Sequence, residues 1–333
     1  MAGLFSLASP VTSLTTVFVA WKAVLLAFAL GAVFGPDYDT STSLFFDRLY
    51  GSRARVPYLA ASLTRWDALY FVQHARQGYV FEQQWAFGAA MPALVRALVA
   101  LMPAWLVDTD AIATEPLVAV AVAHASHLAA VLALYRLTLL LSGDVKLAYV
   151  ASALHVFSPA GVFLSAPYAE SPFAALSFAG ILLFALGVKN KREPVKRFAY
   201  IVAAGAVLGL STSFRSNGLA TGALFAVGAV NCLVALAREP SVGRLVALAA
   251  PGIGGLCVAA GSVVPQFFAW KRYCRDALPE LGPRPWCSRT IPSIYGFVQE
   301  EYWSVWPESG PALRPLPPFL LPSARRRVAP LRC

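Results

Sequence analysis

The sequence predicts an all-α polytopic membrane protein, a bundle of several membrane-spanning helices. Of its 333 residues, 58% are apolar and only 13% are charged, and a mean hydropathy of +0.62 is not that of a soluble globular chain. The apolar residues are gathered in long runs that almost lack charge. These runs are rich in Ala, Leu, Val and Phe without strict alternation, which favours helices over a membrane barrel.

Seven runs are long enough to cross a bilayer, which needs about 20 helical residues per crossing. They cover residues 11–34, 111–141, 146–163, 168–188, 198–214, 218–237 and 245–270. The stretch 89–107 is also apolar, but Arg96 and Pro103 interrupt it, so we interpret it as re-entrant or interfacial. The first run contains Lys22 and is longer than an ordinary signal-peptide core, which favours an uncleaved span.

The polar stretches between the runs are too short to bury a core of their own. Residues 1–306 are therefore interpreted as one multi-span membrane domain, with its longest polar loops at 35–88 and 271–306. Residues 307–333 hold seven prolines and many arginines, and this composition predicts a disordered tail.

The basic residues predict the orientation of the chain in the membrane. The densest basic loop contains Lys189, Lys191, Arg192, Lys196 and Arg197, and the positive-inside rule makes it cytoplasmic. Counting spans outward from it assigns loops 35–88, 164–167, 215–217 and 271–306 to the lumenal face. Lys271, Arg272 and Arg275 oppose this count, but they begin a long loop, which has less weight in the rule. Such membrane-edge clusters explain the net charge of +10, and without a basic stripe the chain predicts no nucleic-acid partner.

A carboxylate in the first lumenal loop is the strongest catalytic candidate. Asp67 is the only acid between Arg65 and Glu82, and the neighbouring Trp66 and Tyr70 lower the polarity around it. Lower polarity raises a carboxyl pKa and suits a general base. An ion pair with Arg65 or Arg76 is the structural alternative, and the residues alone favour it.

Two further lumenal strings carry polar groups beside the predicted spans. Arg215-Ser216-Asn217-Gly218 offers a guanidinium that matches a phosphate, although a snorkelling arginine in a plain turn would look the same. Glu170 follows Pro167-Tyr168 in an apolar context, where an acid is either functional or a helix cap. On this topology both strings converge with Asp67 on one face.

The sequence predicts neither a metal nor a cofactor. The histidines, at positions 74, 124, 127 and 155, form no metal-ligand pair with a cysteine or an acid at useful spacing. Cys274 and Cys287 lie in the same predicted lumenal loop, where an oxidising compartment permits a disulfide that would hold Pro285-Trp286 near the membrane.

Four strings resemble a known family. RWDALYFVQHARQGYVFEQQWAF, SPAGVFLSAPYAESPFAALSF, FRSNG and PWC followed by IPSIYGFVQEEYW occur in the order found in the second GPI mannosyltransferases, the phosphatidylinositol-glycan class V family of the glycosyltransferase C superfamily. The resemblance implies a multi-span enzyme of the endoplasmic reticulum with a lumenal active site. That enzyme transfers the second, α-1,6-linked mannose from dolichyl-phosphate mannose to the GPI precursor.

The resemblance also implies roles for individual residues. It assigns the catalytic base to Asp67. The expected substrate-binding residues are Arg65, Trp66, His74, Tyr168, Glu170, Arg215, Asn217 and Trp286. The expected partners are the two lipid substrates, membrane lipids and a small membrane accessory subunit.

The chain departs from the family pattern at Gly88-Ala89-Ala90 and, more markedly, at Ser304-Val305-Trp306-Pro307. Family members continue with further membrane helices, so the resemblance implies a C-terminally truncated chain whose activity is in doubt. A dolichyl-phosphate-mannose-dependent enzyme acting on the N-glycan precursor, a polytopic transporter and a non-catalytic scaffold are the alternatives. The sequence shows no internal repeat of the kind that favours a transporter.

Overall fold

The computed structural model describes residues 6–35, 40–103, 112–276 and 284–303, and these residues form the predicted all-α fold. Within these described ranges, six helical stretches are long and apolar enough to cross a membrane. They are α1 (Pro10–Gly31), α6 (Thr114–Ser142), α8 (Glu170–Lys189), α9 (Pro194–Phe214), α10 (Gly222–Arg238) with the turn Ser216–Thr221 before it, and α11 (Val242–Trp270) with the turn Lys271–Arg275 after it. The predicted tail, 307–333, lies outside the described residues.

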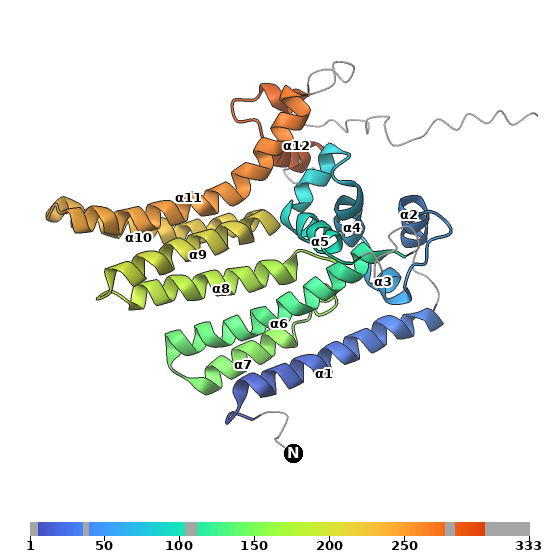
Figure 1. Cartoon of the computed structure of the whole chain (residues 1–333), viewed down its shortest axis with the longest axis horizontal. Helices are drawn as coiled ribbons and strands as arrows, with labels where there is room; N and C mark the ends of the chain where they lie inside the picture. Colours follow the sequence, from blue (N-terminus) through green and yellow to red (C-terminus); the bar gives the residue numbers. More distant parts are fainter. Residues whose placement is uncertain (1–5, 36–39, 104–111, 277–283, 304–333) are drawn as a thin grey trace, which may run out of the picture.

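The long helices lie roughly parallel and the shorter elements gather at one end of them (Figure 1). The shorter elements are α2 (Ser41–Tyr50), α3 (Tyr58–Leu63), α4 (Ala68–Gln77), the 3-10 turn Glu82–Phe87, α5 (Ala90–Ala100), the 3-10 turn Pro285–Ser288 and α12 (Ile294–Glu301). The basic connection between α8 and α9 lies at the opposite end. Loops 35–88 and 271–306, to the extent that they are described, therefore share one end, as the sequence predicts.

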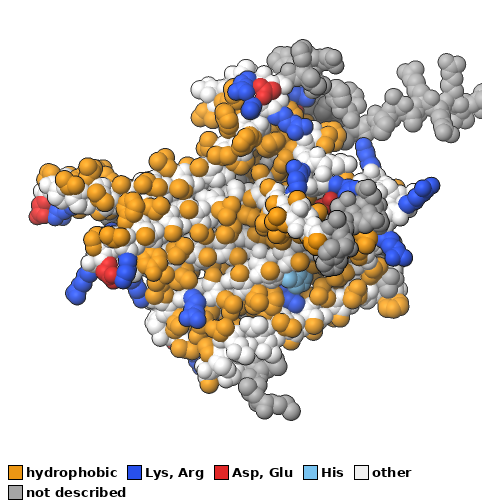
Figure 2. All heavy atoms as spheres, in the orientation of Figure 1, with side chains coloured by type: hydrophobic (Ala, Val, Ile, Leu, Met, Phe, Trp, Pro, Cys, Tyr) orange, Lys and Arg blue, Asp and Glu red, His pale blue; other side chains and the backbone are white. Residues whose placement is uncertain are grey.

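The outer surface of the bundle suits a hydrocarbon environment. Figure 2 shows hydrophobic side chains over most of the face formed by α8 to α11, with lysine and arginine side chains mainly at the ends. Leu256 is 71% exposed, and Val227 and Val263 are each 61% exposed. Large apolar side chains at such exposure are stable in lipid and are a liability in water.

One predicted span differs from the structure. Residues 146–163 were expected to form a continuous helix, but α7 spans only Val145–Val156 and the chain from Phe157 to Ala169 is non-helical. Pro159 lacks a backbone N–H and its ring clashes with the preceding turn, so it ends α7. The segment 157–169 then leads back to the start of α8, at the end of the bundle that holds α3 and α4 (Figure 1).

Lys22 of α1 explains how this non-helical segment is tolerated between helices. Its Nζ donates to the carbonyl oxygen of Leu164 at 3.0 Å and to Ser165 Oγ at 2.7 Å. Ser171 Oγ donates to the same Leu164 oxygen at 3.0 Å. Irregular backbone at membrane depth is stable only where protein groups satisfy its polar atoms, and Lys22 provides such a group.

Close approach of α9 and α11 depends on glycines. A Cβ on Gly205 would lie 2.3 Å from the Cα of Gly254, and a Cβ on Gly209 would lie 2.3 Å from the carbonyl oxygen of Cys257. Gly205 and Gly209 are four residues apart and so share one face of α9, the small-xxx-small pattern of membrane helix pairs. This contact fixes the ends of α9 and α11 relative to each other.

Gly209→Ala should therefore destabilise the bundle by about 1–3 kcal/mol, the usual cost of overpacking, because the new methyl group meets backbone. Gly252→Ala on α11 is the matched control, since a Cβ at Gly252 meets nothing within 4 Å. Thermal unfolding of the two purified variants in detergent measures the difference. Equal midpoints would show that the α9–α11 contact tolerates a methyl group.

Candidate functional site

A strained turn presents Asp67 at the start of α4. Trp66 has a φ of 52°, the left-handed conformation that costs a non-glycine residue about 1–2 kcal/mol. The helix after it is anchored because Ala68, Phe71, Val72 and Ala75 are buried and share one face. Asp67 is exposed to the space outside this packed face. Strain of this kind gathers at functional sites, and the buried face of α4 holds the turn in place.

Asp67 lies on the wall of a cavity of about 360 Å³. The segments that line the cavity are far apart in the sequence. They include the start of α4, the turn Glu82–Phe87 with Gly88 after it, the chain entering α8, the connection between α9 and α10, the C-terminal part of α11 and α12. Of the residues predicted from sequence, it brings together Asp67, Tyr168, Glu170, Arg215 and Asn217. Convergence of polar groups from several segments is typical of an active site.

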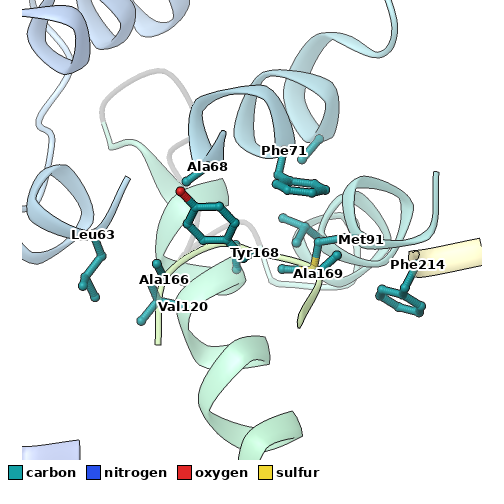
Figure 3. Close-up of a cluster of buried hydrophobic side chains, with 12 residues drawn as sticks. Leu63, Ala68, Phe71, Met91, Val120, Ala166, Tyr168, Ala169 and Phe214 are labelled. Atoms are coloured by element: carbon teal, nitrogen blue, oxygen red, sulfur yellow. The ribbon is translucent and has the colours of Figure 1, made fainter. Parts of the chain in front are cut away.

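Tyr168 joins the non-helical segment to the Asp67 turn. Its hydroxyl donates to the carbonyl oxygen of Arg65 at 3.1 Å, and its ring packs edge-on against Phe71. Figure 3 shows the Tyr168 ring close to α4 and α6, with its hydroxyl directed toward Ala68. The position of Asp67 is therefore set by the same apolar cluster that positions the start of α8.

Acidic and basic side chains both line the cavity. Arg215 follows α9 and its Nη1 forms an ion pair with Glu170 Oε1 at the start of α8, while Glu170 Oε2 is buried without a hydrogen-bond partner. Partial burial raises the pKa of Asp67, and the charge of Arg215 opposes that rise. Arg76, one of the two ion-pair partners considered for Asp67, pairs instead with Glu115 at 3.3 Å. The site thus combines a carboxylate of raised pKa with a guanidinium.

The other predicted site residues lie outside this cavity. Arg65 and Trp66 line a separate groove beside α1. His74 is fully buried and its ring packs 4.4 Å from that of Tyr79; burial and the nearby Arg96 lower the pKa of His74 to about 3. Trp286 is fully buried, and its Nε1 donates to Glu82 Oε1 at 2.9 Å. The geometry gives His74 and Trp286 packing partners rather than access to the cavity.

The loop that carries Trp286 is tied to the membrane end of α11. Cys274 and Cys287 form a disulfide, with their Cα atoms 5.6 Å apart. The bridge holds the turn Pro285–Ser288 against Tyr273, and Trp286 of that turn packs in a buried cluster with α12. In the described part of the chain, no group of three or more His, Cys, Asp or Glu side chains could hold a metal.

Gly88 and Gln266 are among the cavity residues that were not predicted as site residues from the sequence. Gly88 has a φ of +73°, and a Cβ there would lie 2.5 Å from the carbonyl oxygen of Phe214, so only glycine allows the first loop to contact the end of α9. Gln266 of α11 also lines the cavity, and its Oε1 accepts from Ser293 Oγ at 3.1 Å and from the Tyr295 backbone N–H at 3.2 Å. An amide inside an apolar span was the available signal for Gln266.

Comparison with known proteins identifies the family of the chain. A family model described as "Mannosyltransferase (PIG-V)" matches residues 12–326. GPI mannosyltransferase 2 of Gibberella zeae is 53% identical over 89% of this chain and 67% of its own length, and that of Chaetomium globosum is 44% identical over 94% and 73%. GPI alpha-1,6-mannosyltransferase 2 of Rattus norvegicus is 32% identical over 79% of this chain and 55% of its own length. No solved structure matches significantly. The chain belongs to the PIG-V family of mannosyltransferases.

Proposed function

We propose that this enzyme transfers an α-1,6-linked mannose from dolichyl-phosphate mannose to the GPI precursor, at the lumenal face of the endoplasmic reticulum membrane. The names of its relatives support the acceptor and the linkage. The observation that carries the proposal is the cavity, in which Asp67 and the Arg215–Glu170 pair lie together at one end of a membrane bundle. At that level both lipid substrates can present their head groups while their chains stay in the bilayer.

Asp67 is the general base of the proposed reaction. Its carboxylate removes the proton from the 6-hydroxyl of the acceptor mannose while that oxygen bonds to the anomeric carbon of the donor. The bond from the anomeric carbon to the phosphate oxygen breaks, and dolichyl phosphate leaves with the electron pair. A β-linked donor and an α-linked product require a single inversion, so one base suffices and no covalent sugar intermediate forms.

Arg215 is the proposed partner of the leaving phosphate. Its guanidinium lines the cavity and forms an ion pair with Glu170, which fixes its direction. Negative charge grows on the phosphate oxygen as the bond breaks, and a preorganised cation stabilises that charge most in the transition state. Asn217, on the turn after Arg215, adds a side-chain amide to the same wall. We propose no metal for this step, because the leaving phosphate is already a stable anion.

Asp67→Asn should lower the transfer rate by about 10²–10⁴-fold, the usual contribution of a general base, with little change in the amount of folded protein. Microsomes from cells that lack the second mannosyl transfer, given dolichyl-phosphate mannose and a GPI precursor with one mannose, provide the assay. Asp47→Asn is the control, because Asp47 is an exposed acid of the same loop that does not line the cavity. Full activity of Asp67→Asn would refute the assignment of the base.

Arg215→Gln should move the acid limb of the pH–rate profile to higher pH. A general base works only when ionised, so the rate falls as the pH drops through its pKa. Because the charge of Arg215 lowers the pKa of Asp67, removing that charge raises this pKa and the rate is lost at a higher pH. Arg215→Lys keeps the charge and should leave the limb close to that of the wild type. An unmoved limb in Arg215→Gln would show that another group titrates.

The proposed orientation is tested by labelling single cysteines in sealed microsomes, in a chain whose Cys232, Cys257 and Cys333 are replaced by serine. Lys191→Cys, between α8 and α9, should react with a membrane-impermeant maleimide at once. Ser52→Cys is exposed at the other end of the bundle and should react only after the membrane is permeabilised. The reverse pattern would move the site to the cytosolic face.

A further inference from the structure

A second concave surface, the α1 groove, lies beside the catalytic cavity. It has a volume of about 540 Å³ and runs between α1, α3 and the non-helical segment 157–169. Its apolar lining comes mainly from Leu25, Phe28 and Ala29 of α1, from Ala32 directly after α1, and from Val162 and Phe163 of the segment. The α1 residues recur at helical spacing and so form one continuous face. Phe28 is 73% exposed and Val162 is 55% exposed, so the groove is open to the lipid side of the bundle.

The polar side chains of the groove come from α3 and from the turn before α4. They include Tyr58 and Ser62 of α3 and Arg65, which lies two residues before Asp67. Binding sites for amphipathic ligands combine an apolar wall with a few polar groups that fix orientation. A hydrocarbon chain along α1, with its head group near Arg65, matches this distribution.

The strained turn separates the groove from the cavity. Asp67 lines the catalytic cavity, whereas the preceding Trp66 lines the groove, where its ring lies 6.3 Å from that of Phe163. The left-handed φ of Trp66 directs the two neighbouring side chains to different spaces. Tyr168 lines both spaces, so its ring forms part of the wall between the groove and the cavity that holds Asp67.

We propose that the α1 groove binds a hydrocarbon chain of the acceptor glycolipid. The inference rests on the proposed function, in which two lipids meet at Asp67. An in-line displacement puts the attacking hydroxyl and the leaving phosphate on opposite sides of the anomeric carbon. Arg215 takes the phosphate on the α9 side of the cavity, which leaves the approach across Tyr168, on the Trp66 side of Asp67, to the molecule that supplies the hydroxyl.

The far wall of the groove is held by Lys22. Its Nζ bonds to Leu164 and Ser165 fix the segment that contributes Val162 and Phe163. A groove formed by ordinary lipid-facing helices would have no such internal support. The wall therefore has a defined shape that can select a chain, rather than a surface that bulk lipid merely covers.

Filling the groove tests the proposal. Ala29→Trp adds bulk to its floor, and Ala27→Trp makes the same change two residues away, at an exposed position of α1 that does not line the groove. With a one-mannose phosphatidylinositol glycolipid that carries two long acyl chains, Ala29→Trp should raise the acceptor KM at least tenfold over Ala27→Trp. With a short-chain, water-soluble version of that acceptor, the two variants should have the same KM. The KM for dolichyl-phosphate mannose should also be the same in both.

Equal acceptor KM values for the two variants with the long-chain glycolipid would overturn the proposal, and so would a raised KM for the donor instead. A binding measurement separates this result from a failure of the proposed function. A long-chain acceptor with a photoreactive diazirine in one acyl chain should cross-link to α1 in wild type and Ala27→Trp and at least fivefold less in Ala29→Trp, whether or not transfer occurs. Cross-linking that is the same in all three proteins would place the chain elsewhere.

Discussion

The site depends on a short stretch of chain that is not helical where a membrane span was expected. Backbone N–H and C=O groups without partners are costly in hydrocarbon, and a helix normally satisfies them. In segment 157–169 protein groups do so instead: Lys22 reaches across from α1 to Leu164, and Ser171 donates to the same carbonyl. A buried lysine is costly at this depth unless it has such acceptors, so the cation and the unwound segment depend on each other.

The non-helical segment and the start of α8 that follows it contact the candidate site in two places. Tyr168 bonds to the carbonyl of Arg65, which fixes the turn that carries Asp67, and Glu170 bonds to Arg215 two helices away. Asp67 and Arg215 are therefore both held by contacts from the stretch of chain that enters α8, although they are 148 positions apart in the sequence.

Much of this arrangement could be predicted from the sequence, for reasons that are physical. Long apolar runs have few alternatives to a membrane helix, so the spans were found, and the basic loop at 189–197 then put Asp67, Glu170 and Arg215 at one end. Two features could not be derived. The apolar run 146–163 does not show whether Pro159 kinks the helix or ends it. Whether the chain can leave the helix there depends on Lys22, which is far away in the sequence. The aromatic sequences around His74 and Trp286 do not indicate whether these two side chains are exposed, and in the structure both are fully buried.

The backbone conformation of Trp66 is the feature that the sequence predicts least. It lies at the turn where the cavity and the α1 groove adjoin. The left-handed φ of Trp66 carries strain of about 1–2 kcal/mol, and such strain persists only where the surroundings over-determine it. Here Tyr168 and the buried face of α4 hold the turn on both sides. In the proposed function a sugar moves from one lipid to another in the same bilayer, so the two head groups must meet while their chains stay apart. The turn places the Trp66 ring in the α1 groove and the Asp67 carboxylate in the cavity, and so provides that separation within two residues.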